Sequence, residues 1–436
     1  MPNPYIPNTD DDRRVMLDRI GVASVDALFD DIPEHCRNPG LLLPQPLSEQ
    51  ELVAELAGIA ARNWSVAEMP CFLGGGAYRH FIPSVVDYVT RQGAFATAYT
   101  PYQPEISQGT LQSIFEFQSL VCELTGMDVA NAGMYDGASA LAEACLMAVR
   151  VTGRERLALL STVNPRYRCI VQTYAEGHSL PVDIVTPKEI SLTDDHACLV
   201  VQQPNFFGYF EDVAALEKQA HAAGALYIVV PDAISLGMFR PPGEYGADIV
   251  VAEGQPLGIP LSFGGPYVGL FAAKQDYVRQ MPGRLVGRTK DVEGRTGYVL
   301  TLQTREQHIR RERATSNICS NEQLCALAAT VYLCAMGRQG LRQVAELCYH
   351  KAHYAAEKVG ELPGYSLPLT GDFFQEFIVS CPRPPAAINA ELLERRIIGG
   401  LDVSDSIENG MLLCVTEVNT REEIDALVET LGEIGQ

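Results

Sequence analysis

The fold class is decided by the stretch Leu226-Tyr-Ile-Val-Val-Pro-Asp-Ala233. Its five leading apolar residues predict a strand that is buried on both faces, as in a parallel sheet. A second apolar run begins at Ile249, passes through Glu253-Gly-Gln-Pro256 and reaches a Gly-rich turn that ends at Pro266. From residue 128 to residue 272 strand and helix patterns alternate, which predicts an α/β fold with a largely parallel sheet.

Apolar runs at six places predict the strands of this sheet. They are Leu157–Leu160, Val182–Val185, Cys198–Val201, Leu226–Val230, Ile249–Val251 and Val268–Phe271. Helical patterns fall between many of them, as at Ala138–Val151 and Val213–Ala223. Parallel strands need such crossover connections, so we expect helices on both faces of the sheet.

The helix and strand patterns divide the chain into three predicted segments. Residues 1–95 form an N-terminal helical arm, in which Thr9 and the capping box Ser48-Glu-Gln-Glu51 begin helices. Residues 96–320 form a large domain. Residues 321–436 form a small C-terminal domain, because the capping box Ser320-Asn-Glu-Gln323 opens a long helix there. Its expected strands are Glu376–Ser380 and Met411–Val415, and its expected helices are Ala390–Arg396 and Ile424–Leu431.

Composition and charge exclude several classes of protein. The chain has 436 residues and a net charge of −21, whereas a nucleic-acid partner needs a basic face. Its 12 cysteines form no C-x-x-C pair and no His/Cys spacing that suits zinc. We find no apolar signal segment and no run of about eighteen apolar residues. We therefore expect a cytoplasmic protein with reduced thiols, no metal site and no membrane span.

Residues at the strand ends form a pattern found in enzymes that use pyridoxal phosphate (PLP). In such enzymes a strand-end Asp faces the pyridinium nitrogen, and a Lys just after the next strand forms the Schiff base. Asp232 has the first position, but Gln255 stands in the turn where the Lys is expected. A Gln side chain cannot form an imine. Lys274 lies beyond the following strand, and we interpret it as a surface residue.

Two further segments complete this pattern. Gly137 and Ser139 begin a helix rich in Ala and Leu, and backbone N–H groups at such a start suit a phosphate. An ordinary capped helix start is the alternative, and it is favoured for this segment taken alone. Asn205 lies in a loop between this helix and Asp232. The order of phosphate loop, Asn loop and Asp matches a PLP site of the aspartate-aminotransferase type, which indicates ancestry rather than activity.

A polar and aromatic loop precedes the predicted sheet. It carries, beside two prolines that stiffen it, the side chains of Tyr99, Tyr102, Gln103, Glu105 and Gln108. Buried at an interface, the phenols would offer apolar area and a hydrogen-bond donor together, so we favour a contact with another molecule. His80, which follows a Gly-rich turn, is a candidate for the same contact, with a structural role as the alternative.

One basic cluster is the exception in this acidic chain. It is Arg305-Glu-Gln-His-Ile-Arg-Arg-Glu-Arg313. The interleaved Glu residues favour a solvated helix face, and docking of an acidic partner is the alternative.

Three motifs carry a resemblance to a known family. They are Tyr99-Thr-Pro-Tyr-Gln-Pro-Glu-Ile-Ser-Gln-Gly109, Gly254-Gln-Pro-Leu-Gly-Ile-Pro260 and Arg313-Ala-Thr-Ser-Asn-Ile-Cys319. They resemble the amino-terminal half of glycine decarboxylase, the P-protein of the glycine cleavage system. Some bacteria and archaea split this enzyme into two chains, and the present chain resembles subunit 1. The resemblance covers essentially the whole chain, and the Tyr99 motif is highly specific.

The resemblance implies a type I PLP-enzyme fold, with a mostly parallel seven-stranded sheet and a small C-terminal α/β domain. It implies an α2β2 assembly with a homologous subunit 2, which carries PLP and the Schiff-base Lys. The assembled enzyme would decarboxylate glycine and transfer the aminomethyl group to the lipoyl group of H-protein, and this chain alone would be inactive. The cofactor site here would be vestigial, formed by Gly137, Ser139, Asn205, Asp232 and Gln255. The Tyr99 loop and His80 would reach the partner's active site or the lipoyl channel.

Two other functions remain open. A free-standing PLP decarboxylase or aminotransferase would need a Lys near position 255. A purely structural or regulatory partner subunit would place no residue in any active site.

Overall fold

The computed structural model describes residues 5–37, 39–318 and 322–435, which form two compact units, one up to Trp64 and one from Ser65 onward. The first unit contains α1 (Asp10–Ile20), η1 (Asp26–Phe29), η2 (Glu34–Cys36) and α2 (Glu49–Ala60), where η marks a 3-10 helix. Thr9 and Ser48 begin α1 and α2, as predicted, and both form complete capping boxes, of which only the one at Ser48 was predicted. Neither helix has a buried residue, so local capping rather than a core defines both.

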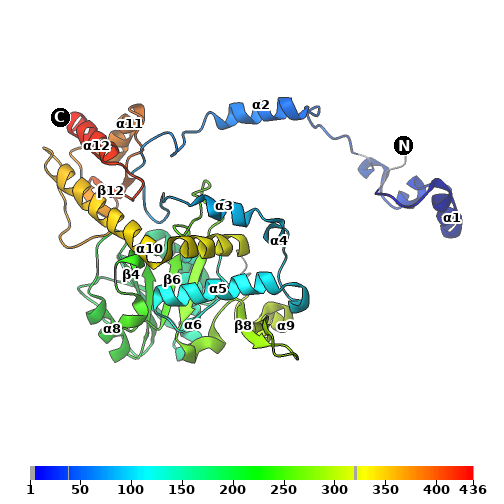
Figure 1. Cartoon of the computed structure of the whole chain (residues 1–436), viewed down its shortest axis with the longest axis horizontal. Helices are drawn as coiled ribbons and strands as arrows, with labels where there is room; N and C mark the ends of the chain where they lie inside the picture. Colours follow the sequence, from blue (N-terminus) through cyan, green and yellow to red (C-terminus); the bar gives the residue numbers. More distant parts are fainter. Residues whose placement is uncertain (1–4, 38, 319–321, 436) are drawn as a thin grey trace. The chain divides into compact units, whose positions relative to one another are not determined.

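The second unit is built on a seven-stranded sheet with the order β1-β7-β6-β5-β4-β2-β3 (Figure 1). Strands β2 to β6 pair in parallel, whereas β7 is antiparallel to β6 and β1 is antiparallel to β7. The strands are β1 (Val129–Ala130), β2 (Arg156–Leu160), β3 (Val182–Val185), β4 (His196–Gln203), β5 (Leu226–Pro231), β6 (Ile249–Glu253) and β7 (Gly269–Ala273). The predicted α/β fold and its six strands are confirmed; β1 is too short to show a periodic pattern.

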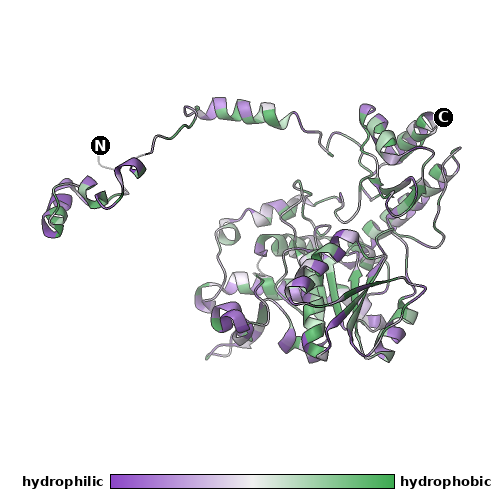
Figure 2. Ribbon diagram, turned by 180° about the vertical axis from the view of Figure 1, so that it is seen from behind, coloured by the Kyte–Doolittle hydropathy of each residue, from purple (hydrophilic) through white to green (hydrophobic). Residues whose placement is uncertain are grey.

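Helices surround this sheet (Figure 1). They are α3 (Ser84–Thr90), α4 (Gly93–Ala96), α5 (Gln108–Thr125), α6 (Gly137–Thr152), α7 (Pro165–Gly177), α8 (Val213–Ala222) and α10 (Gln323–Gly360). The strands between them are hydrophobic (Figure 2), and Leu199, Ile228 and Val250 are almost wholly buried in the main core. Burial on both faces explains why β4 to β6 read as continuous apolar runs rather than as alternating patterns.

Helix α10 is, among the described residues, the one helix long and apolar enough to cross a membrane by length and composition alone. The core helix of a globular protein passes the same test, and Ala329, Tyr332 and Ala345 of α10 are fully buried in the main core. Gly337, with φ 60° and ψ −180°, interrupts the helix. The capping box predicted for its start falls partly on residues 320 and 321, which lie outside the described residues.

A second sheet lies in the C-terminal part, with β12 (Gly410–Cys414) between β10 (Glu376–Ser380) and β11 (Leu401–Asp402). Helices α11 (Pro385–Glu394) and α12 (Arg421–Ile434) accompany it. The predicted helix 390–396 starts too late and ends too late: Pro385 begins α11, and Arg396 has φ 62°, which a right-handed helix excludes. The domain boundaries at residues 95 and 320 stay a prediction.

An antiparallel hairpin was not predicted. It consists of β8 (Leu285–Lys290) and β9 (Thr296–Thr301) and packs against α5. After it come η7 (Gln303–Arg305), α9 (Gln307–Arg310) and η8 (Arg311–Arg313). Most side chains of β8 beyond Val286 are exposed, so the hairpin lacks the apolar run on which strand prediction depends.

Candidate functional site

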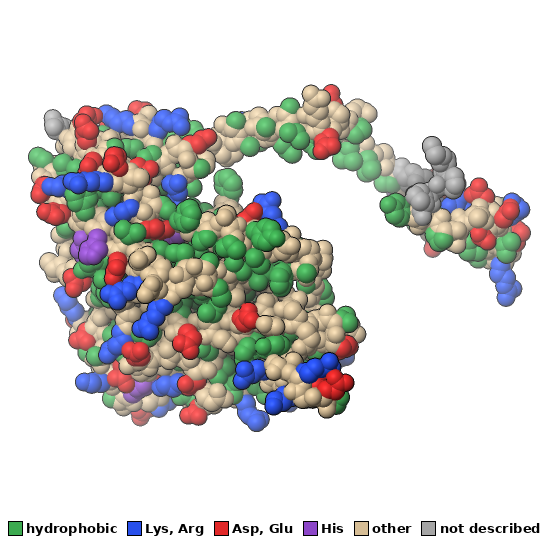
Figure 3. Space-filling model, viewed as in Figure 1, with side chains coloured by type: hydrophobic (Ala, Val, Ile, Leu, Met, Phe, Trp, Pro, Cys, Tyr) green, Lys and Arg blue, Asp and Glu red, His purple; other side chains and the backbone are tan. Residues whose placement is uncertain are grey.

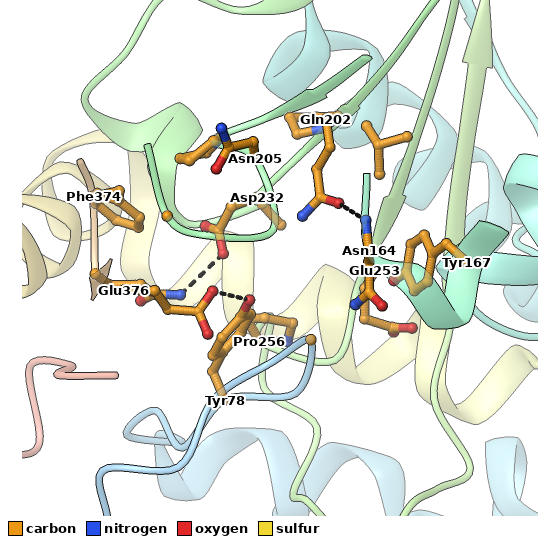
Figure 4. A pocket seen from close by; sticks show the side chains of 17 residues that line it. Tyr78, Asn164, Tyr167, Gln202, Asn205, Asp232, Glu253, Pro256, Phe374 and Glu376 are labelled. Atoms are coloured by element: carbon orange, nitrogen blue, oxygen red, sulfur yellow. Dashed lines mark hydrogen bonds between the residues drawn. The ribbon is translucent and has the colours of Figure 1, made fainter. Parts of the chain in front are cut away.

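A small cavity lies where β4, β5 and β6 end (Figure 4). In open α/β sheets, ligands bind at this carboxyl edge. The space inside is about 40 Å³, enough for a few water molecules. Its polar lining comes from the Gly-rich turn, the strand ends, the start of α7 and the start of β10: Tyr78, Asn164, Tyr167, Gln202, Asn205, Asp232, Glu253, Gln375 and Glu376.

Asp232 stands at the end of β5, as predicted from the sequence. Its Oδ1 accepts a hydrogen bond from the backbone N–H of Ser235 at 2.8 Å, and its Oδ2 accepts one from Nε2 of Gln375 at 3.0 Å. Burial raises the pKa of the Asp232 carboxyl above its ordinary value. The carboxylate therefore already has hydrogen-bond donors from its own chain on both oxygens.

Gln255 is only 2% exposed and is held by three hydrogen bonds. Its Oε1 accepts from the backbone N–H of Tyr78 at 2.8 Å, and its Nε2 donates to the carbonyls of Tyr78 and Ile259 at 2.9 and 2.8 Å. The side chain thus joins the Gly-rich turn to the turn after β6. It serves as a structural link between two segments that are far apart in the sequence.

The start of α6, which we considered for a phosphate, is occupied by carboxylates of the same chain. Gly137 N–H donates to Oε2 of Glu253 at 3.0 Å, and Ser139 N–H donates to Oδ1 of Asp136 at 2.7 Å. Gln255 N–H donates to the second Glu253 oxygen at 3.0 Å. A Cβ at Gly137 would meet Tyr167 Oη at 2.6 Å, so the contact is tight. This geometry is that of the alternative, a capped helix start.

Asn205 lies at the cavity wall and organises its own loop. Its Oδ1 accepts from the backbone N–H groups of Phe207 and Tyr209 at 3.0 and 3.2 Å, and its Nδ2 donates to Glu211 at 2.9 Å. The amide is therefore satisfied within the loop.

Tyr78 and Glu376 close one side of the cavity (Figure 4). Tyr78 Oη donates to Oε2 of Glu376 at 2.8 Å, and Gly75 N–H donates to Oε1 at 2.7 Å. Burial raises the pKa of Glu376 to about 7 and raises that of Tyr78 well above its ordinary value. On the opposite side lies Glu253, whose pKa burial raises to about 8.

The loop with the predicted contact residues stands apart from this network and faces outward. Tyr99 is 85% and Tyr102 is 40% exposed, and Gln103 and Glu105 are exposed too. Tyr102 Oη accepts from Nη2 of Arg284 at 3.2 Å. Gln108 instead bonds inward, with Nε2 donating to the Tyr298 carbonyl at 2.9 Å and Oε1 accepting from Tyr298 N–H at 2.8 Å.

His80 points into its own chain, with its side chain only 2% exposed. Its Nδ1 lies 2.7 Å from Oε2 of Glu417, which also accepts from Sγ of Cys348 at 3.4 Å. The three groups place potential metal-ligand atoms within 4.8 Å of one another. These hydrogen bonds account for the grouping, and they match the structural alternative for His80.

The basic cluster 305–313 forms no continuous helix face. Arg305 donates to the backbone carbonyls of Met281 and Gly283. Arg311, the first residue of η8, has φ 53° and ends α9, because a positive φ does not fit a right-handed α-helix. The predicted solvated helix face is therefore replaced by two short turns with exposed Arg side chains.

Comparison with known proteins assigns the family. Residues 3–431 match the family model described as glycine cleavage system P-protein. This chain belongs to the P-protein family. It is 54% identical to a probable glycine dehydrogenase (decarboxylating) subunit 1 of Thermomicrobium roseum, over 98% of this chain and 99% of that protein. It is 53% identical to the protein of that name from Desulforamulus reducens, over 99% of each chain.

Solved structures agree with this assignment. A crystal structure of glycine decarboxylase (P-protein) of the glycine cleavage system, in inhibitor-bound form, is 44% identical, with a TM-score of 0.92 over 99% of this chain and 100% of that chain. Mouse CSAD in apo form, at 14% identity and a TM-score of 0.67 over 95% of this chain and 92% of that chain, shows the fold alone. The fold is that of type I PLP-dependent enzymes.

The P-protein family uses this PLP-enzyme fold, but the cavity of the present chain does not fit PLP. Its lining residues, all within the described part of the chain, include no Lys, Arg or His that would pair with a phosphate. Glu253 occupies the α6 start where the phosphate would bind, and a second carboxylate, Glu376, faces the same space. Neither carboxyl group supplies the positive charge that a phosphate needs as a partner.

Sequence reasoning did not single out several cavity residues of this P-protein family member. They are Tyr78, Asn164, Tyr167, Gln202, Glu253, Gln375 and Glu376. Two signals were available in the sequence. Glu253 is a charged residue at the end of a strand, and Glu376 is a charged residue that opens an apolar strand. No local pattern shows that these two residues line the same cavity.

Proposed function

We propose that this chain is subunit 1 of a glycine dehydrogenase (decarboxylating) and that its activity depends on a homologous subunit 2. In this proposal glycine is decarboxylated and its aminomethyl group is transferred to the lipoyl group of H-protein, in the cytoplasm. PLP and the Schiff-base Lys belong to subunit 2. The support is the family, together with relatives named subunit 1 that match over nearly their whole length.

One observation supports the assignment of the Schiff-base Lys to subunit 2 rather than to this chain. Gln255, at the position expected for the Lys, is buried and all three of its amide contacts are made to the backbone of its own chain. An amide in this role cannot act as a nucleophile toward an aldehyde. PLP supplies an electron sink for the electrons of the bond that breaks. In this proposal that chemistry takes place on subunit 2.

The contribution of the present chain lies on its surface. Tyr99 and Tyr102 present phenol groups that can bury apolar area and donate a hydrogen bond to a partner. Helix α3 exposes Val85 and Tyr88, and hydrophobic side chains gather over this part of the face (Figure 3). Such exposed apolar groups are typical of a subunit interface. We propose that this face contacts subunit 2 as part of an α2β2 assembly, with the Tyr99 loop at its active site or lipoyl channel.

The test uses the two subunits purified together and measures exchange of labelled CO2 into glycine. Replacing Tyr102 with Ala should lower the exchange rate at least tenfold while the subunits still elute as one complex. Tyr354→Phe is the matched control, because Tyr354 Oη also makes a surface hydrogen bond, to Asp425 at 2.6 Å. Unchanged assembly and unchanged exchange in Tyr102→Ala would contradict the role of the loop.

A second measurement separates this proposal from a free-standing PLP enzyme. The chain alone is incubated with PLP, reduced with borohydride and weighed by mass spectrometry. We expect no specific label on Lys, because no Lys lies in the turn after β6. Specific labelling of one Lys would show an imine and overturn the dependent-subunit reading.

A further inference from the structure

Two segments that are far apart in the sequence meet at a second cavity, which encloses about 50 Å³. Tyr102 of the Tyr99 loop lines this cavity, together with three residues of the segment 314–318: Thr315, Ser316 and Ile318. Both segments belong to motifs that carry the family resemblance, at residues 99–109 and 313–319. The proposed function uses the first motif at the contact with subunit 2 and gives no role to the second.

Residues around this cavity connect the two segments. Tyr102 Oη accepts from Nη2 of Arg284 at 3.2 Å, and Nε of Arg284 lies 3.4 Å from Oε2 of Glu306. The backbone carbonyl of Arg305, the residue before Glu306, accepts from the N–H of Thr315 at 3.0 Å. The position of Thr315 and that of Tyr102 are thus linked through residues in direct contact.

The segment 314–318 has no regular secondary structure, and the hydroxyl of Ser316 attaches it to the large sheet domain. Ser316 Oγ donates to Oε1 of Glu143 at 2.8 Å and accepts from the backbone N–H of Ile318 at 3.0 Å. A Ser hydroxyl has a single proton to donate. Because Glu143 accepts that proton, the hydroxyl has a fixed direction and is left as an acceptor for Ile318. The carboxyl of Glu143 thereby fixes both the side chain and the backbone of the segment.

Glu143 is a costly residue at its place in the core. It lies within α6, is only 5% exposed and is flanked by the buried residues Ala142 and Ala144. Burial raises the pKa of its carboxyl, because the charged form loses its hydration. Its Oε2 is buried and has no hydrogen-bond partner among the described residues. An apolar side chain would avoid this cost, and residues that break the local pattern in this way are typical of functional positions.

We infer that Glu143 is a positioning residue for the reaction on subunit 2, because it holds Ser316 and so fixes the segment 314–318 beside Tyr102. Glu143 acts through Ser316 and does not face the partner itself, since it is buried in α6. The inference rests on the proposed function, in which the Tyr99 loop lies at the active site or lipoyl channel of subunit 2. It adds the second motif to that contact and names the buried residue that keeps the motif in place.

The first test measures hydrogen–deuterium exchange of backbone amides in the full-length chain alone. Glu143→Leu removes the acceptor of the Ser316 hydroxyl, so the amides of the segment 314–318 should exchange at least tenfold faster, whereas those of α6 should keep the rates of the parent chain. Glu143→Gln keeps an oxygen for the hydroxyl and should restore the slow exchange. Unchanged exchange in Glu143→Leu would overturn the inference. Faster exchange along the whole of α6 would also overturn it, because Glu143 would then support the fold in general.

The second test measures exchange of labelled CO2 into glycine by the two subunits purified together. Glu143→Leu and Ser316→Ala should each lower the rate at least tenfold, and the double variant no further than the stronger single variant, because both changes break the same hydrogen bond. Glu143→Gln should retain most of the rate. Thr330→Val is the matched control and should leave the rate unchanged, because the buried Thr330 hydroxyl donates to the Ala326 carbonyl within α10.

The outcomes separate this inference from the proposed function. If Tyr102→Ala lowers the rate of CO2 exchange and Glu143→Leu does not, although its subunits elute as one complex, the inference fails and the proposed function stands. If neither variant lowers the rate, the proposed role of the Tyr99 loop fails, and the inference fails with it. Additive losses in the double variant of Glu143 and Ser316 would overturn the assignment of one shared hydrogen bond.

Discussion

Beside the cavity at the strand ends, Gln255 is 2% exposed and makes three hydrogen bonds within its own chain, whereas in the polar loop Tyr99 is 85% exposed. Both regions were chosen from the sequence for their polar side chains. The polar groups of the cavity mostly satisfy one another and so hold distant segments together. Those of the loop are mostly left to the solvent. Where a polar side chain finds its partners thus distinguishes a residue that supports the fold from one that is available to another molecule.

The largest effect we expect is on the stability of the chain, at Gln255 beside the cavity. Gln255→Leu leaves one buried N–H and two buried carbonyls without their partner, so the free energy of unfolding should fall by at least about 3 kcal/mol. Urea unfolding of the full chain measures this. Gln108→Leu, whose hydrogen bonds are exposed, is the matched variant and should cost about 1 kcal/mol. A smaller loss of unfolding free energy for Gln255→Leu than for Gln108→Leu would contradict this prediction.

The next effect is a pH dependence of stability. Burial raises the pKa of Glu253 from 4.5 to about 8, so between these values the folded chain holds a proton that the unfolded chain has released. The stabilisation is complete below pH 4.5 and is lost as the pH rises to 8, with a slope of up to about 1.4 kcal/mol per pH unit. Glu253→Gln should remove this part of the slope between pH 6 and 8. Parallel curves for variant and parent, from urea unfolding at each pH, would show that Glu253 does not titrate there.

A substitution in the Tyr99 loop should affect binding to the partner rather than the stability of this chain. Tyr99→Ala is expected to weaken binding to subunit 2 about tenfold, or about 1.4 kcal/mol. Its free energy of unfolding should change by less than about 0.5 kcal/mol, because Tyr99 is exposed. Binding is measured by titration of labelled subunit 2, and unfolding by urea. A loss of stability without a loss of binding would place Tyr99 with the structural residues.

The smallest expected effect is none at all. Gln255→Lys restores the missing amine, yet the chain should still give no specific PLP adduct after borohydride reduction. Glu253 still occupies the start of α6, and the cavity lacks a cation for the phosphate. A specific adduct at position 255, found by mass spectrometry, would show that the lost Lys is the only obstacle.

Local patterns in the sequence predicted much of the fold. The apolar runs of β2 to β7, the helix cap at Thr9 and the capping box at Ser48 depend on residues a few positions apart, so a single chain segment shows them. Asp232 and Gln255 were found in the same way, from their places after apolar runs. The α11 boundaries and the β8–β9 hairpin were missed, because a local left-handed residue and exposed side chains leave no periodic signal.

The sequence by itself determined the α/β sheet, the strand-end Asp and the absence of a Lys after β6. Only the tertiary structure decided what replaced the lost site. The bond between Tyr78 and Glu376 joins residues 298 positions apart, and Gly137 and Glu253 meet across 116 positions. Such contacts depend on how the strands are ordered in the sheet and on which turns face one another. Neither propensity nor periodicity contains this information, because both describe the chain only over the length of one element.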